Sequence, residues 1–250
     1  MSGRSRIRGE GSLAGGTYRQ AHGVFVGVDV PCHVNNVELI SDALAPALET
    51  STVIRGEAAA RSSILAQLEN VMQAARREDL IIAYFSAHTH QAYGDLYLLP
   101  ADFDPEAPLA TAVSFRLISA VLASKPDVRG LIILDAGNAA AVGYDMSGYH
   151  IGSELGLMVS CGPNEQSYAT IRGGGNVGDF TWHLAKVLNG TISKAAPGPW
   201  RLPLIDWFDK AAGRTEKSAG RRQHPVILGT LSASLELRSR RDGDVTRHMS

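Results

Sequence analysis

The sequence predicts an α/β protein built as a three-layer sandwich, in which helices flank a mostly parallel central sheet. Three observations support this prediction. Short apolar runs with many β-branched residues recur along the chain, as expected of buried strands. Segments with apolar residues at helical spacing lie between these runs, as in strand–helix–strand units. The length of 250 residues is enough for one sizeable domain.

The first third of the chain contains two strand–helix units. Residues 23–30 form a nearly continuous apolar run, which predicts a buried strand. Apolar residues between 37 and 48 then recur at helical spacing and predict a helix. A short strand is expected at 52–54, and a second helix at 64–75 ends in a charged segment.

The middle of the chain supplies the remaining main strands. Residues 80–86 are almost entirely apolar and predict a buried strand, and 96–99 predict a short strand that a proline closes. A helix at 117–122 precedes another apolar strand at 131–135. A further strand is expected at 155–161.

The last part of the chain mixes regular elements with a long irregular segment. A helix is predicted at 180–188, with the Asn-Gly pair at 189–190 as its C-terminal cap. Residues 191–222 are rich in Pro, Gly and Lys, with one apolar island at 202–208. Residues 225–229 predict a late edge strand.

The composition and the terminal segments of the sequence limit which partners and which location we expect for the protein. The formal net charge of -1 gives no reason to expect nucleic acid or an anionic membrane as a partner. We expect a flexible segment at 1–20, one α/β domain at 21–235 and a polar tail at 236–250. The first segment lacks the apolar core of a secretion signal, and no apolar run approaches the roughly 20 residues of a membrane span. These features predict a cytoplasmic protein.

Cysteine and histidine usage predicts no cofactor and no metal. Two cysteines, Cys32 and Cys161, form neither a disulfide framework nor a zinc-binding pattern. We expect Cys161 to be a buried, small apolar residue at a strand end. The glycines at 173–175 lack the Lys-Ser/Thr pair of a phosphate-binding loop, so they predict a turn.

Several motifs occur in an order that resembles the caspase superfamily of cysteine peptidases (peptidase C14 type), especially its bacterial caspase-like and metacaspase-like branch. The motifs are Tyr-Phe-Ser-Ala-His-Thr at 84–89, Tyr-Leu-Leu-Pro-Ala-Asp at 97–102, Leu-Asp-Ala-Gly-Asn at 134–138 and Ser-Cys-Gly-Pro-Asn-Glu at 160–165. With the glycine-rich segment and helix at 173–188, the resemblance extends over about residues 22–235. It implies a caspase-like sandwich with strand order 2-1-3-4-5 along the sheet.

The resemblance assigns a role to each matching position. His88 corresponds to the catalytic base, which takes the thiol proton and returns it to the leaving amine. The backbone N–H groups of Thr89 and Gly137 correspond to the oxyanion donors. Asp135 and Glu165 correspond to acids that, in metacaspase-like members, bind a basic substrate side chain.

Gly137 is the important departure, because it occupies the position of the nucleophilic cysteine. A glycine has no side chain that can attack a carbonyl, and loss of a covalent nucleophile costs on the order of 10⁶ in rate in a serine peptidase. Asn138, Ala139 and Ala140 differ from the family pattern as well, and both glycines around His88 are replaced. We therefore predict a pseudo-protease that binds a protein or peptide partner, such as an active caspase-like paralogue.

An active hydrolase is the alternative, and it has two forms. In the first, Cys32 acts as a relocated nucleophile in a cysteine-type endopeptidase with a basic P1 preference, although Cys32 would approach from the wrong side of the oxyanion donors. In the second, a metal binds His88 and His90, which point the same way on an extended segment. Its third ligand would come from Asp29, Asp135 or His150.

Overall fold

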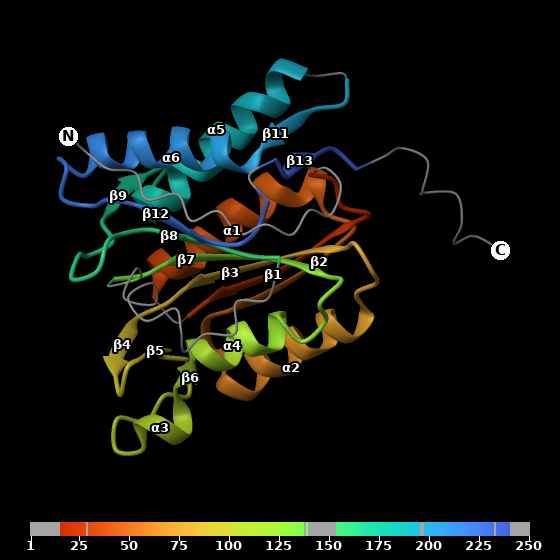
Figure 1. The fold of residues 1–250 in the computed structure, drawn as a ribbon. Helices are drawn as coiled ribbons and strands as arrows, with labels where there is room; N and C mark the ends of the chain where they lie inside the picture. Colours follow the sequence, from red (N-terminus) through yellow and green to blue (C-terminus); the bar gives the residue numbers. More distant parts are fainter. Residues whose placement is uncertain are drawn as a thin grey trace, which may run out of the picture.

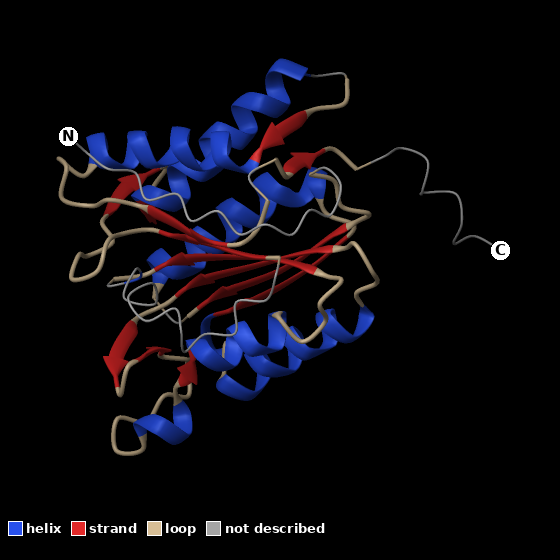
Figure 2. Cartoon of the chain, in the orientation of Figure 1, coloured by secondary structure: helices blue, strands red, loops and turns tan. Residues whose placement is uncertain are grey.

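The structure is a computed structural model that describes residues 16–28, 30–137, 139, 154–195, 198–232 and 234–240. Figure 2 shows one central sheet between two layers of helices, so the predicted α/β three-layer sandwich is confirmed. The six-stranded sheet has the order β12-β8-β7-β3-β1-β2. Its strands are β1 (Ala21–Gly27), β2 (Thr50–Arg55), β3 (Leu80–Ser86), β7 (Arg129–Asp135), β8 (Leu155–Val159) and β12 (Val226–Gly229). The first five follow the predicted order 2-1-3-4-5.

The two central strands determine where a functional site can form. Every residue of β3 and β7 is buried, because helices cover both faces of the sheet. The strands pair in parallel with Ser86 opposite Asp135. Their carboxyl ends therefore lie side by side, and the segments that follow them, from Ala87 and from Ala136, start at the same edge of the sheet.

Two helical layers produce two separate apolar cores. Helices α1 (Pro31–Leu44), α5 (Asp179–Ala195) and α6 (Leu204–Ser218) cover one face, and α2 (Arg61–Ala74) and α4 (Phe115–Leu122) cover the other (Figure 1). The side chains of each strand alternate between these cores. The sheet is thus covered on both sides and only its ends are left for binding.

Small antiparallel elements surround the main sheet. A three-stranded sheet contains β4 (Thr89–Ala92), β5 (Asp95–Leu98) and β6 (Val113–Ser114), with the short helix α3 (Pro108–Thr111) beside it. A hairpin joins β9 (Ala169–Arg172) to β10 (Gly175–Gly178) through Gly173 and Gly174, whose φ angles of 62° and 89° favour glycine. This confirms the turn that the sequence predicted.

Two predictions near the C-terminal end are wrong. The Asn-Gly pair at 189–190 does not cap α5, which continues to Ala195; Ile192 packs against the core there and offsets the cost of about 1 kcal/mol for a helical glycine. The apolar island at 202–208 is not an isolated patch in a loop, because it begins α6. Trp207 is fully buried, and its indole N–H donates to the Leu184 carbonyl at 2.8 Å.

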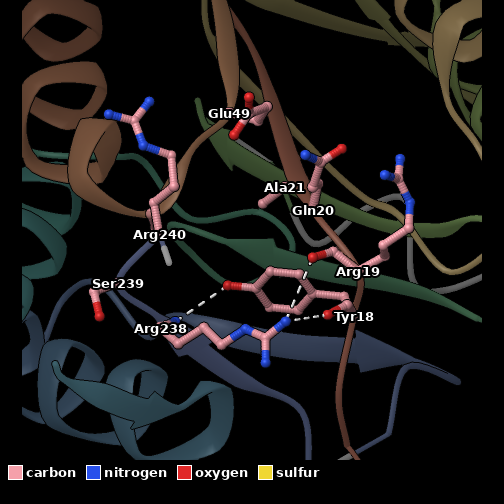
Figure 3. Close-up of a pocket in the computed structure, with 9 residues that line it drawn as sticks. Tyr18, Arg19, Gln20, Ala21, Glu49, Arg238, Ser239 and Arg240 are labelled. Carbon is pink, nitrogen blue, oxygen red and sulfur yellow. Dashed lines mark hydrogen bonds between the residues drawn. The ribbon is translucent and has the colours of Figure 1, made fainter. Parts of the chain in front are cut away.

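The two ends of the described chain meet beside the sheet. Strand β11 (Arg201–Pro203) pairs with β13 (Glu236–Arg238), so the segment predicted as a polar tail begins with a strand. Figure 3 shows the Arg238 guanidinium over the Tyr18 ring, 5.0 Å from its centroid, and bonded to the Tyr18 carbonyl. Tyr18 is itself buried, within the segment predicted to be flexible. Within the described residues, no helix has the length and apolarity needed to cross a membrane.

We predict that Trp207→Ala lowers the free energy of unfolding by about 3–5 kcal/mol, because it empties a fully buried site between α5 and α6. Trp207→Phe should cost clearly less, since it keeps most of the apolar contact and removes the hydrogen bond. Urea unfolding followed by circular dichroism measures both values. Equal losses for the two variants would contradict the packing described for α6.

Candidate functional site

The carboxyl ends of β3 and β7 bring the predicted catalytic positions together. Thr89 follows β3 by three residues, and Gly137 follows β7 by two. The Thr89 hydroxyl donates to the Gly137 carbonyl at 2.6 Å, so these two predicted oxyanion positions are in direct contact. His88 is exposed beside them. The structure therefore assembles His88, Thr89 and Gly137 at one edge of the sheet.

The position of Gly137 has room for a side chain. A Cβ atom built on Gly137 meets no atom of the described residues within 4 Å, and its backbone is not in the left-handed region. Glycine is therefore not required here by close packing or by conformation. This contrasts with Gly178, where a Cβ would lie 2.4 Å from the Asp135 Oδ2 atom.

His88 has a neighbour that the sequence did not reveal. The rings of His33 and His88 lie with their centroids 4.9 Å apart and their planes at 73°. His33 Nδ1 lies 3.0 Å from the Val28 carbonyl, which can only accept, so Nδ1 carries the proton. Burial is the main cause that lowers the pKa of His33 to about 4, and His88 adds to this effect. His33 is thus neutral at pH 7.

Asp135 is enclosed. Its side chain accepts hydrogen bonds from the Ser167 hydroxyl at 2.5 Å, the Thr181 hydroxyl at 2.5 Å and the Thr181 N–H at 3.3 Å. Only 3% of the residue is exposed. Burial raises the pKa of Asp135 above its usual value, although these three hydrogen bonds act in the opposite direction. The predicted substrate-binding acid is therefore engaged within the protein.

Asn36 connects the strand end to the β9–β10 hairpin. The residue is 2% exposed; its amide donates to the Ser86 hydroxyl at 3.0 Å and accepts from the Gly178 N–H at 2.7 Å. A buried polar side chain on the apolar face of α1 is the signal that the sequence offered. It was missed because both of its partners are distant in sequence.

Glu165, the second predicted acid, lies nearer the surface and is paired. It accepts from His224 Nδ1 at 2.7 Å, from the His224 N–H at 2.8 Å and from the Gly162 N–H at 2.9 Å. Partial burial acts to raise the pKa of Glu165, but the hydrogen bonds from His224 and Gly162 outweigh it and lower the pKa. His224 therefore already forms the hydrogen bonds to the Glu165 carboxylate that a basic ligand would form.

Neither thiol is activated. Cys161 is fully buried, as predicted, and donates to the Ala136 carbonyl at 3.2 Å. Cys32 is half-buried in the first turn of α1. Burial, with a smaller contribution from Asp135, raises the pKa of the Cys32 thiol to about 11, and burial raises that of Cys161 to about 11. Both remain protonated at pH 7, and a thiol is a far weaker nucleophile than a thiolate.

The metal alternative finds little support among the described residues. They contain no group of three His, Cys, Asp or Glu side chains that could hold a metal ion. Of the third ligands considered for His88 and His90, Asp135 is enclosed by its hydrogen-bond donors. The other two, Asp29 and His150, lie outside the described residues.

Comparisons with known proteins bear on the fold only. No protein-family model matches the chain, and no curated protein matches it either. Among solved structures, the chain is similar to protein GSU0716 from Geobacter sulfurreducens, with a TM-score of 0.62 and 12% sequence identity. The match covers 86% of this chain and 94% of that one. At such low identity the likeness supports the α/β sandwich and no particular activity.

We predict opposite effects for alanine at two glycines of this site. Gly137→Ala should keep or raise the free energy of unfolding, by up to about 1 kcal/mol, because the Cβ has space and the unfolded chain loses freedom. Gly178→Ala should lower it by about 1–3 kcal/mol, because the Cβ clashes with Asp135. Denaturant unfolding of both variants provides the measurement. A strong loss for Gly137→Ala would show that the position is not open.

A second prediction concerns pH. The pKa of Glu165 is lower in the folded protein, so its contribution is complete above the unfolded pKa of about 4.3 and disappears as pH falls through the folded pKa. Glu165→Gln should therefore cost about 1 kcal/mol at pH 7 and progressively less below pH ~4. Unfolding curves of both proteins at several pH values test this. A difference independent of pH would contradict an ionised Glu165 carboxylate in this contact.

Proposed function

We propose that this protein is a caspase-like pseudo-protease of the cytoplasm, a non-catalytic regulator that binds a protein or peptide partner such as an active caspase-like paralogue. One observation carries the proposal. Gly137, which the resemblance aligns with the nucleophilic cysteine, accepts a hydrogen bond from Thr89, and a Cβ atom there would meet no atom of the described residues within 4 Å. Gly137 has no side-chain atom that could attack a carbonyl, so covalent acyl transfer cannot begin at this position.

The other described groups with nucleophilic atoms at this edge support the same proposal. The Ser86 hydroxyl is buried and bonded to Asn36, and the Thr89 hydroxyl donates to the Gly137 carbonyl. The thiols of Cys32 and Cys161 have pKa values of about 11. Each of these groups is committed to a structural contact or protonated, so none replaces the missing cysteine.

A binding role would use Glu165 and His224, which lie near the surface. The Glu165 carboxylate is ionised and partly exposed, with His224 as an exposed partner. A guanidinium or ammonium group could take the place of His224, because a carboxylate accepts such donors strongly. The partner would then present an Arg or Lys side chain to Glu165, while Asp135 supports the site from inside.

We expect no cleavage of Arg or Lys fluorogenic peptides by the purified protein, with or without a chelator, because the nucleophile is absent. A Cys32→Ser variant should give the same baseline. A caspase-like peptidase that has the catalytic cysteine serves as the positive control, and the activity of a candidate paralogue should change when the protein is titrated in. Turnover that Cys32→Ser abolishes would favour the relocated cysteine, and turnover that the chelator abolishes would favour the metal-assisted hydrolase. Absence of both binding and turnover would contradict the regulatory proposal.

A further inference from the structure

The three-stranded sheet next to His88 has one buried and one open face. Leu98 of β5 and Val113 of β6 lie opposite each other and are buried in the main core. His90 of β4 and Tyr97 of β5 lie opposite each other on the other face, because side chains alternate along a strand. In Figure 1 this sheet and α3 extend away from the main sandwich, so the second face is not covered by its helices.

A cavity of about 130 Å³ lies on this open face. Its walls are mostly apolar and include three aromatic rings: Tyr93, Tyr97 and Phe103. An engineered cavity of about 150 Å³ with apolar walls holds one benzene molecule, so this space fits a single aromatic ring or branched aliphatic side chain. The size therefore indicates one anchoring side chain of a larger ligand.

Two large side chains at the rim of the cavity are exposed to solvent. Tyr93 is 82% exposed and Leu109 is 56% exposed, and both line the cavity. Tyr93 and Gly94 have φ angles of 50° and 69° and form the two-residue turn that joins β4 to β5, so the left-handed conformation of Tyr93 belongs to this hairpin. The exposure of these large side chains does not benefit the isolated fold, which is consistent with a ligand that covers this rim.

The charges of this region indicate what kind of ligand covers it. Residues 89–114 contain four acidic side chains and no lysine or arginine. Three of these acids, Asp102, Asp104 and Glu106, are exposed in the loop that also carries Phe103. The two arginines that border the region donate to backbone carbonyls: Arg61 to Ala112 at 3.1 Å and Arg116 to Gly94 at 2.8 Å. The loop that carries Phe103 is thus acidic, with three exposed carboxylates, in a protein that is nearly neutral.

We propose that this cavity is a peptide-binding site for a basic segment of a partner protein, whose one bulky apolar side chain enters between Tyr97, Phe103 and Leu109. The exposed acids beside Phe103 attract the flanking Arg or Lys residues. The site lies on the opposite face of β4 from Thr89 and makes no use of Gly137 or Glu165. It therefore stands whether or not the protein is a pseudo-protease.

Fluorescein-labelled peptides test this directly by anisotropy titration of the full-length protein. The probes are Arg-Arg-Phe-Arg-Arg, Arg-Arg-Ala-Arg-Arg and Glu-Glu-Phe-Glu-Glu amides. We expect the first to bind at least about tenfold more tightly than the second, from burial of the ring, and the third not to bind. Affinity of the first peptide should fall with added salt.

Matched variants distinguish binding at the cavity from binding elsewhere on the surface. Leu109→Ala should weaken binding of the Phe peptide about threefold or more, whereas Leu117→Ala, at an exposed leucine of α4, should leave it unchanged. Asp104→Asn with Glu106→Gln should weaken binding about threefold and reduce its salt dependence, while Asp206→Asn with Asp209→Asn on α6 should not. Ala92→Trp should block the cavity.

Several outcomes would overturn the proposal. Equal affinity for the Phe and Ala peptides would show that no apolar side chain enters the cavity. Undiminished binding to Ala92→Trp or Leu109→Ala would place the peptide elsewhere. Loss of binding in Glu165→Gln would assign the peptide to the vacant cleft of the proposed function, so the two sites are distinguished by the same titration.

Discussion

The buried carboxyl group of Asp135 is the constraint on which the end of the sheet depends. A carboxylate removed from water costs several kcal/mol unless donors surround it, and here Ser167 and Thr181 supply them. Thr181 is in the first turn of α5, and Gly178 approaches the carboxylate so closely that no Cβ fits. One side chain thus fixes the positions of β7, the β9–β10 hairpin and α5 relative to one another.

Under the proposed function, this arrangement explains how the site can keep its structure without a nucleophile. The groups that define the site, Asp135, Asn36 and Thr89, all take part in hydrogen bonds that hold the fold together. Gly137 contributes only its carbonyl to these bonds, and a Cβ atom there would meet no atom of the described residues within 4 Å. Under the proposed function, loss of the cysteine removes catalysis and leaves this end of the sheet intact, because stability depends on the neighbours and not on the reacting atom.

The sequence predicts those parts of the fold that depend on local pattern. The strands at 80–86 and 131–135 were located almost to the residue, since continuous apolar runs identify buried strands. Helix α6 was missed because its apolar residues are interspersed with eight charged or polar ones and only Trp207 and its neighbours stand out. The contacts of His33 with His88 and of Glu165 with His224 join distant segments, and no local pattern encodes them.

Strand β4 places two different surfaces on opposite sides of one short segment. Thr89 points toward Gly137, whereas His90, the next residue, lines the aromatic cavity. Because adjacent residues of a strand face opposite ways, the cavity residues can change without altering the hydrogen bond at Gly137. The chain therefore has two regions that can vary independently: a sheet edge held by buried polar groups and a cavity lined by mostly apolar side chains. A protein that acts by binding alone can use both at once, because neither surface has to hold a reacting atom in place.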